Sequence, residues 1–311
     1  MAEAKTTKHP SSAVQTTGHA WDGDLQEFNN PLPRWWLWSF YATVLFAVIY
    51  WVIYPAWPVG DTYTTGVLNN ITYKVGDQDV TTHWNTRARL MAEMQTGEAA
   101  VKQQQHMNEV AAADYSEILA NPEMMDFTRS VGKVLFADNC AACHGSGGQG
   151  VVGRYPNLVD DAWLWGGSVE NIHATIAQGR QGYMPPFKNT FTDEQFGRVA
   201  EYVLSLSGHE VDPTVAEQGK ALFQGTVGGC YACHTQEGTG LPSVGAANLT
   251  DSIWTVAGVP GQQTMDGKRA AVVEVIRNGI SREMPAWDGR LTETEVKLLT
   301  VYVHDLSGGT N

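Results

Sequence analysis

The sequence predicts a mainly α-helical protein, with one membrane-spanning helix near the N-terminus followed by two tandem copies of one helical module. Three observations predict this architecture: an apolar run without charge over 35–54, a repeat that covers 127–210 and 211–311, and a polar, helix-favouring connector at 55–126 between them. A polar segment, 1–34, precedes the apolar run. All four cysteines of the 311-residue chain fall at matching places in the two copies of the repeat.

The apolar run reads WWLWSFYATVLFAVIYWVIY and is bounded by Arg34 and Pro55. A helix of this length covers about 30 Å, the hydrocarbon thickness of a bilayer. The core helix of a soluble protein would be shorter and would show a polar stripe. Tryptophan and tyrosine residues gather at both ends of the run, as they do at membrane interfaces. Because no small-residue cleavage site follows, we expect a permanent anchor in the lipid bilayer instead of a cleaved signal peptide.

The distribution of basic residues predicts the orientation of this anchor. Lys5, Lys8 and Arg34 precede the run, whereas Lys74 is the only basic residue within about twenty positions after it. The positive-inside rule therefore predicts a single pass, with the N-terminus in the cytoplasm and the bulk of the chain exported.

The overall charge excludes one class of function. The chain carries 33 acidic and 20 basic residues, a formal net charge of −13. Nucleic-acid binding needs clustered lysine and arginine to contact phosphates, so we expect no nucleic-acid partner.

The connector is predicted to begin with loop and a short hairpin near 72–75 and to continue as helix over 83–119. Asn121-Pro122 should end that helix. A polar helical stretch of this kind is usually a solvated connector or a surface that packs against a partner protein.

The two modules match along most of their length. The segment 131–136 resembles 218–223, and 175–187 resembles 274–287. Capping boxes at Thr192 and Thr292 begin the last helix of each copy, and Gly208 and Gly308 stand where a left-handed C-terminal cap is expected. A module of about ninety residues has a thin core, which a large apolar cofactor would fill.

The repeated motif is Cys140-Ala-Ala-Cys143-His144 in the first copy and Cys230-Tyr-Ala-Cys233-His234 in the second. This pattern is typical of covalent haem c attachment, in which two thiols bind the haem vinyl groups and the histidine binds the iron. A zinc site would need shorter gaps between its cysteine pairs, and a redox dithiol would need a βαβ context. We therefore expect two haem c groups, anchored by these four cysteines and ligated by His144 and His234, in two class I cytochrome c-like domains.

Met184 and Met284 are the candidates for the remaining axial positions. Both stand at equivalent repeat positions, both follow a glycine-containing loop, and both precede proline. Thioether sulfur suits the iron of an electron carrier. Met265 and His173 are weaker competitors, because neither has a counterpart in the other copy. Pairing within one module, His144 with Met184 and His234 with Met284, is the simpler topology, but an exchange between modules would leave the same sequence.

Iron with two protein ligands has no open position for substrate, so these sites predict electron transfer without a catalytic residue. Aromatic side chains are expected to pack around each haem, and several arginines are candidates to pair with haem propionates. The aromatics are Tyr155, Trp163, Trp165, Tyr183 and Phe187 in the first copy and Trp254 and Trp287 in the second; the arginines are Arg154, Arg180 and Arg282.

The run Asp22 to Trp36, DGDLQEFNNPLPRWW, followed by one span, a connector and two Cys-x-x-Cys-His modules, resembles the CcoP (FixP) subunit of cbb3-type cytochrome c oxidases. The resemblance implies a dihaem subunit of a bacterial inner membrane, with its haem domains in the periplasm. It also implies that a donor cytochrome c delivers electrons, and that a monohaem cytochrome c subunit and a haem-copper subunit, which reduces O2 and pumps protons, receive them. The chain itself would have no catalytic site. The alternatives are an anchored dihaem carrier that serves another dehydrogenase or reductase, and a dihaem peroxidase, which needs one open haem position.

Overall fold

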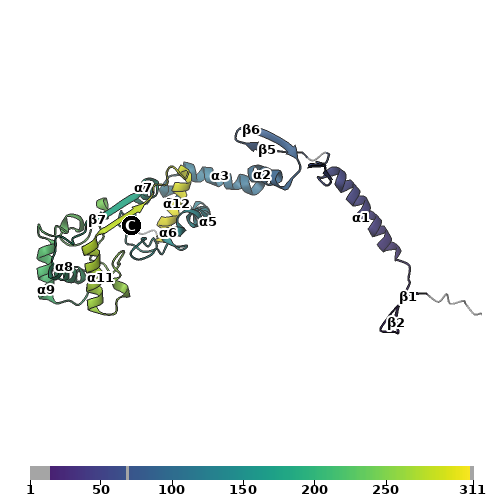
Figure 1. Ribbon diagram of the computed structural model, residues 1–311. Helices are drawn as coiled ribbons and strands as arrows, with labels where there is room; N and C mark the ends of the chain where they lie inside the picture. The colour runs from purple at the N-terminus through teal and green to yellow at the C-terminus, as the bar shows by residue number, and fades with distance from the viewer. Residues whose placement is uncertain (1–14, 68–69, 309–311) are drawn as a thin grey trace, which may run out of the picture. The chain divides into compact units, whose positions relative to one another are not determined.

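The computed structural model describes residues 15–67 and 70–308 and divides the chain into two compact units (Figure 1). The first unit ends at Val101 and the second begins at Lys102. Lys5 and Lys8, used above to predict orientation, and the last three residues of the second module lie outside the described residues. The module boundaries predicted from the repeat remain predictions.

The described part of the first unit contains three hairpins and the apolar helix. Its elements are β1 Thr16–Trp21, β2 Leu25–Phe28, α1 Arg34–Ile53, β3 Pro58–Val59, β4 Thr62–Tyr63, β5 Asn70–Val75, β6 Gln78–His83, α2 Thr86–Thr96 and the start of α3 Glu98–Ala112. Each hairpin is a two-stranded antiparallel pair.

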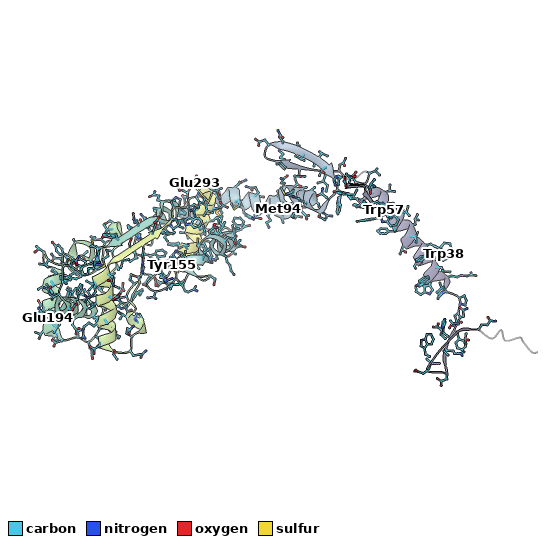
Figure 2. The ribbon with its side chains drawn as sticks, in the orientation of Figure 1. Trp38, Trp57, Met94, Tyr155, Glu194 and Glu293 are labelled. Atoms are coloured by element: carbon cyan, nitrogen blue, oxygen red, sulfur yellow. The ribbon has the colours of Figure 1, made fainter. Side chains whose placement is uncertain are left out.

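Helix α1 has the properties of a membrane span. Its 20 residues have a mean hydropathy of 1.8, and none of its side chains is buried by the rest of the protein. Trp38 projects from the helix near one end and Trp57 follows the other, where it packs edge-on against Trp51 (Figure 2). Because apolar side chains cover every side of α1, it is a candidate for burial in lipid and not in a protein core.

The connector is more divided than the sequence predicts. The hairpin β5–β6 forms where it was expected, and the Gln95 side chain of α2 bonds both the backbone N–H and C=O of Lys74, each at 2.8 Å. The single helix predicted over 83–119 is instead three helices, because Gly97 ends α2 in an extended conformation and Asp114 caps the N-terminus of α4, Tyr115–Ala120.

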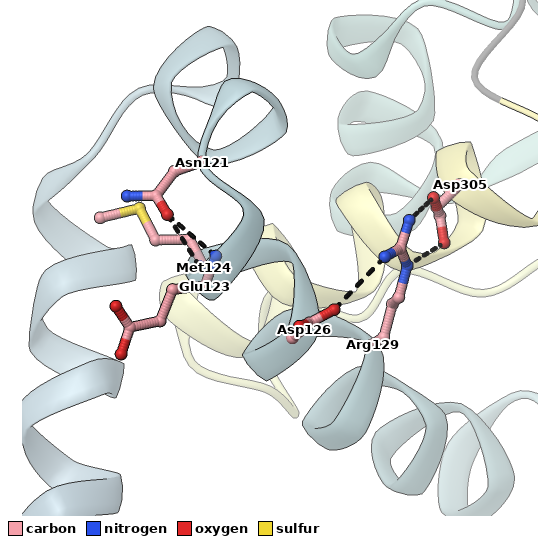
Figure 3. A network of polar contacts seen from close by, with 6 residues as sticks. All are labelled: Asn121, Glu123, Met124, Asp126, Arg129 and Asp305. Atoms are coloured by element: carbon pink, nitrogen blue, oxygen red, sulfur yellow. Dashed lines mark hydrogen bonds and ion pairs between the residues drawn. The ribbon is translucent and has the colours of Figure 1, made fainter.

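The second unit carries the repeat. Its elements are α4, α5 Pro122–Asn139, α6 Ala141–His144, α7 Val169–Gln178, β7 Arg180–Met184, α8 Asp193–Leu206, α9 Pro213–Phe223, α10 Tyr231–His234, the 3-10 turns Pro242–Val244 and Val259–Gly261, α11 Met265–Asn278, β8 Ile280–Met284 and α12 Glu293–Leu306. Asn121 caps α5 by accepting bonds from the backbone N–H groups of Glu123 and Met124 (Figure 3).

The two copies of the repeat exchange their C-terminal parts. Helix α12, from the second copy, packs against α5 and α7 of the first, and α8, from the first copy, packs against α9 and α11 of the second. The crossing segments β7 and β8 pair side by side as an antiparallel ribbon (Figure 1). We call α5, α6, α7 and α12 with their loops the first compartment, and α9, α10, α11 and α8 with theirs the second.

Each compartment has its own apolar core. Phe136 of α5 and Leu299 of α12 are fully buried in the first, and Phe223 of α9 and Leu204 of α8 in the second. Burying a large apolar side chain contributes about 1.5–3 kcal/mol, so these contacts between copies stabilise the exchanged arrangement.

The connector also packs on the first compartment. Val110 of α3 and Ile118 of α4 form a third core with Leu298 on α12. The Lys297 ammonium donates to the carbonyl oxygens of Ala111 and Ala113 at 2.8 and 2.9 Å, next to the C-terminus of α3. The last third of the connector is therefore part of the second unit and not a freely solvated linker.

The capping predictions are confirmed in both copies. Thr192 and Thr292 each form a capping box, with Gln195 and Glu295 as the reciprocal partners. Gly208 and Gly308 both adopt φ +80°, the left-handed conformation that favours glycine after a helix.

Candidate functional site

The first Cys-x-x-Cys-His motif forms a single helical turn directly after α5. Cys140 ends that helix, and its carbonyl oxygen accepts the N–H of His144 at 3.0 Å. The Cys140 thiol is half-buried, and burial raises its pKa to about 11, whereas Cys143 is exposed. Gly145 ends the turn at φ +79° and turns the chain into the loop that leads to α7. The motif therefore presents both thiols and the imidazole from one rigid turn.

His144 is held in one tautomer. Its Nδ1 lies 3.1 Å from the carbonyl oxygen of Pro156, which can only accept, so Nδ1 carries the proton. Burial lowers the pKa of His144 and keeps the ring neutral. Nε2 is then an unprotonated nitrogen, the state that a metal ligand requires.

The second motif repeats this arrangement. His234 ends α10, its Nδ1 donates to the carbonyl oxygen of Ala247 at 2.8 Å, and burial lowers its pKa. Burial also raises the pKa of Cys230 to about 11, as for its counterpart Cys140. The residue after the motif is Thr235 at φ +66°, an uncommon conformation for a β-branched residue. Its hydroxyl accepts the N–H of Thr239 at 3.1 Å, which stabilises the strained turn.

The two carbonyl acceptors were not identified from the sequence. Pro156 and Ala247 lie 12 and 13 residues after the histidines that they bind. The signal was present, because each is followed by the dipeptide Asn-Leu, which makes 156–158 and 247–249 a further match between the copies.

The ribbon β7–β8 carries both candidate methionines. Its register pairs Arg180 with Met284, Gly182 with Arg282 and Met184 with Ile280. These six residues alternate with exposed neighbours on both strands and are half-buried, so they form the inner face of the ribbon. Four strand residues span about 13 Å, and the two methionines therefore stand well apart, at opposite ends of the ribbon.

Met184 lies with the second motif. It lines, together with Cys230, His234 and Trp254, a cavity with about 740 Å³ of empty space, part of which is open to solvent. Clefts that hold cofactors are lined mostly by apolar side chains with a few polar groups, as this one is. The structure thus brings the methionine of the first copy to the histidine of the second.

Met284 lies in the first compartment. It packs against the apolar cluster that contains Phe136 and Ile176, in which Cys140 and Trp163 also take part. Two backbone bonds keep the exchange in place, from the Trp287 N–H to the carbonyl of Ile176 and from the Phe187 N–H to the carbonyl of Ile276, both at 3.1 Å. The structure does not bring together the histidine and methionine of one module, which would be the simpler topology.

The two competing ligands are engaged elsewhere. The Nδ1 of His173 lies 2.6 Å from the Tyr115 hydroxyl, in a contact between α7 and the connector. Met265 begins α11 and packs at the border of the second core.

The aromatic residues follow the exchange as well. Phe187 packs in the second compartment and Trp287 in the first, the reverse of their order in sequence. Tyr183 is on the outer face of the ribbon, 69% exposed, so the expectation that it packs against a haem is wrong.

Buried donors without partners show what kind of group the site fits. Among the described residues, Trp163 Nε1 and both terminal nitrogens of Arg282 are buried and make no hydrogen bond. Burial lowers the pKa of the Arg282 guanidinium. Unpaired buried donors are costly, so an acceptor belongs beside them. A haem, with an apolar ring and carboxylate substituents, matches the apolar lining, the thiols, the imidazoles and these donors.

The chain matches two family models over most of its length. The model described as the N-terminal domain of cytochrome oxidase-cbb3, FixP, matches residues 13–61. The model described as cytochrome C oxidase, cbb3-type, subunit III, matches 128–203 and 214–303, one match for each copy of the repeat. The resemblance noted in the sequence and the two cytochrome c-like domains are therefore confirmed.

Curated relatives match almost end to end. The chain is 42% identical over 306 residues to the cbb3-type cytochrome c oxidase subunit FixP of Azorhizobium caulinodans, with 94% of this chain and 93% of the relative covered. It is 38% identical to subunit CcoP of Cereibacter sphaeroides, with 98% and 99% covered, and 40% identical to FixP of Sinorhizobium medicae, with 99% and 100% covered. The chain belongs to the CcoP/FixP family of cbb3-type cytochrome c oxidase subunits.

Proposed function

We propose that this chain is the dihaem electron-entry subunit of a cbb3-type oxidase. It accepts electrons from a periplasmic cytochrome c and relays them to a monohaem cytochrome c subunit and then to the haem-copper subunit. The observation that carries the proposal is the pair of equivalent Cys-x-x-Cys-His turns, each with its histidine Nδ1 bonded to a backbone carbonyl and each in a compartment that receives one methionine of the shared ribbon.

Each Cys-x-x-Cys-His motif would hold one of two haem c groups. Cys140 and Cys143 would form the thioether bonds of one group, and Cys230 and Cys233 those of the other. Held by one histidine and one methionine, each haem c would supply a one-electron iron couple and would have no coordination position left for O2. The apolar side chains of the two cores exclude water around these groups, which tunes their reduction potentials. The chain therefore acts as a non-catalytic carrier within an O2-reducing complex.

We further propose that the axial methionines are exchanged between the copies. Met184 would pair with His234 and Met284 with His144. The support for this pairing is that Met184 lines the same cavity as His234, while Met284 packs in the cluster that contains Cys140.

Variants that can bind only one haem test the pairing. When Cys140 and Cys143 are replaced by alanine, Met184→His should lower the reduction potential of the remaining haem, because imidazole stabilises the ferric state more than thioether sulfur does. Met284→His in the same background should leave it unchanged. With Cys230 and Cys233 replaced, the two outcomes should be reversed. Potentiometric titration gives both readings, and the opposite pattern would indicate pairing within each module.

The orientation of the anchor is part of the proposal. Arg34 at the start of α1, together with Lys5 and Lys8, supports a cytoplasmic N-terminus and periplasmic haem domains. Protease treatment of spheroplasts should digest the second unit and spare an N-terminal tag. Digestion of the tag alone would reverse the orientation.

Purification from the native membrane tests the assignment to an oxidase complex. A chain tagged at its C-terminus and extracted in mild detergent should bring with it a haem b and copper-containing subunit and a monohaem cytochrome c, identified by mass spectrometry and spectra. A dihaem chain that purifies alone would point to a free-standing anchored carrier.

A further inference from the structure

Arg282 occupies the middle of the inner face of the ribbon β7–β8. It lies two residues from Met284 on its own strand, and it pairs in register with Gly182, which lies two residues from Met184. Two strand residues span about 7 Å. The backbone position that carries the guanidinium is therefore about midway between the two candidate axial ligands.

Two of the three guanidinium nitrogens are buried and unpartnered, although the residue as a whole is half-buried. Its two terminal nitrogens are inaccessible to solvent and make no hydrogen bond among the described residues. Glu283, its nearest neighbour in sequence with a carboxylate, belongs to the exposed outer face of the ribbon. A buried cation without a counter-ion is strongly unfavourable, so an anion that is not part of the polypeptide belongs beside Arg282.

The neighbouring arginine on the same face does not share this property. Arg180 donates from Nε to the Thr175 hydroxyl at 2.9 Å, and its guanidinium lies over the Trp165 ring, 4.9 Å from the centroid. The unpaired donors of the ribbon are thus specific to Arg282.

There is also space beside it. A Cβ built on Gly182 would meet no atom within 4 Å, so the inner face opposite Arg282 is open. Opposite residues of an antiparallel pair point to the same side of the ribbon, and this space lies next to the Arg282 side chain. Donors and open space at one place are what a carboxylate ligand requires.

We propose that the Arg282 guanidinium is a shared counter-ion for propionate carboxylates of both haems, held midway between them by the ribbon. This inference rests on the proposed function, because it assumes a haem in each compartment. A guanidinium offers five donors in a planar fork, which is enough for two carboxylates at once.

The position has an electrostatic consequence. Reduction adds an electron to a haem, and a nearby positive charge favours the reduced form. Arg282 would therefore raise the reduction potential of both haems together.

The test uses the full-length chain in detergent, with its haems attached. Arg282→Gln removes the charge and keeps a shorter, polar side chain. Arg282→Lys keeps the charge and loses the fork. Arg277→Gln is the matched control, because Arg277 is a half-buried arginine of α11 that already has an acidic partner, Asp193, at 2.7 Å. Haem content is measured from the pyridine haemochrome spectrum, both potentials by redox titration, and propionate bonding from resonance Raman bands.

Arg282→Gln should lower both potentials. Charges a few ångströms apart in a protein interact strongly enough to expect a change on the order of tenfold in the oxidised-to-reduced ratio at fixed potential, which is about 59 mV for a one-electron couple. Arg282→Lys should keep both potentials near the parent values and shift the propionate bands of both haems. Arg277→Gln should change neither potential nor bands.

Three outcomes would overturn the inference. Unchanged potentials in Arg282→Gln with both haems attached would show that the guanidinium is not a counter-ion to either, and a shift in one haem alone would show that it is not shared. If Arg282→Gln loses haem, the test rests on the Raman spectrum of Arg282→Lys. Unchanged propionate bands in that variant contradict the proposal. A parent chain without two attached haems would instead refute the proposed function, so the two failures are distinguishable.

Discussion

Two glycines set the point at which the chain crosses from one compartment to the other. Gly179 and Gly279 follow α7 and α11 at φ +71° and +67°. A Cβ on Gly179 would collide with the carbonyl oxygen of Met284, and one on Gly279 with the carbonyl oxygen of Met184. Each glycine therefore lies directly against the methionine that enters from the other copy, and a side chain at either place would push that methionine away.

Gly179→Ala should destabilise the second unit by about 2 kcal/mol or more. Gly179 has φ 71° and ψ 178°, a region that is essentially restricted to glycine and costs other residues about 1–3 kcal/mol, and the collision with backbone atoms adds to this. Gly197→Ala is the matched control, because a Cβ there, inside α8, would meet nothing within 4 Å. It should stabilise by about 0.5–1 kcal/mol through helix propensity. Urea unfolding followed by circular dichroism measures both, and equal stability of the two variants would refute the role of Gly179.

Helix α12 connects several parts of the second unit. It packs against α5 and α7, and Leu298 and Lys297 attach the connector to it. Arg129 on α5 fixes its end, because the guanidinium donates to both oxygens of Asp305 at 2.9 Å (Figure 3). This bidentate contact crosses the boundary between the two copies of the repeat.

Asp305→Asn should therefore destabilise the protein in a pH-dependent manner. The hydrogen bonds and charge of Arg129 hold the pKa of Asp305 below its ordinary value of 3.8. A carboxyl with a lowered folded-state pKa contributes its full stability above the unfolded-state pKa, and the contribution disappears as pH falls through the folded-state value. At pH 7 the variant should unfold at a lower urea concentration than the parent, and the difference should shrink below about pH 4.

Asp126→Asn is the control for this prediction. Asp126 also faces Arg129, at 3.5 Å, but its side chain is 81% exposed and lies one turn away on the same helix (Figure 3). Exposed pairs of this kind contribute little, so this variant should show a much smaller change in urea midpoint at pH 7. A larger effect for Asp126→Asn than for Asp305→Asn would contradict the assignment of the contact between copies.

Elements with strong local signals could be predicted from the sequence. The apolar run predicted α1, the Thr192 and Thr292 boxes predicted two helix starts, and the repeat predicted equivalent places for the two histidines and the two methionines. The connector was predicted less well. Gly97 and Asp114 interrupt its helix, although the composition on either side favours continuation.

The exchange between copies could not be predicted, and the reason is physical. Helix α12 shows the same amphipathic pattern whether it covers α5 or α9, because the two copies offer similar apolar surfaces. Which helix α12 covers is determined by the five-residue strands β7 and β8, which pair across a separation of about one hundred residues. The local sequence of these segments predicts glycine-containing loops. Only the non-local pairing turns them into the ribbon that carries both methionines.

At the scale of the whole second unit, neither copy of the repeat encloses its own motif. The Cys140 turn is covered by α12 and the Cys230 turn by α8, so each compartment is completed by the other half of the chain. The link between the halves is short, from Gly208 at the end of α8 to the Asp212 cap of α9. Its continuity is not what holds the compartments together, since the ribbon and the packed helices already do so.

Cleavage of this link in the folded protein should therefore leave the two halves associated. A protease site inserted after the exposed Glu210 allows the cut in the intact chain. Separation of the halves requires α12 to leave α5 and α8 to leave α9, which exposes both cores. In increasing urea, dissociation measured by size exclusion should coincide with loss of the methionine–iron absorption band of both haems. Halves that separate while both bands persist would show that each copy keeps its own methionine, and the exchanged arrangement would be refuted.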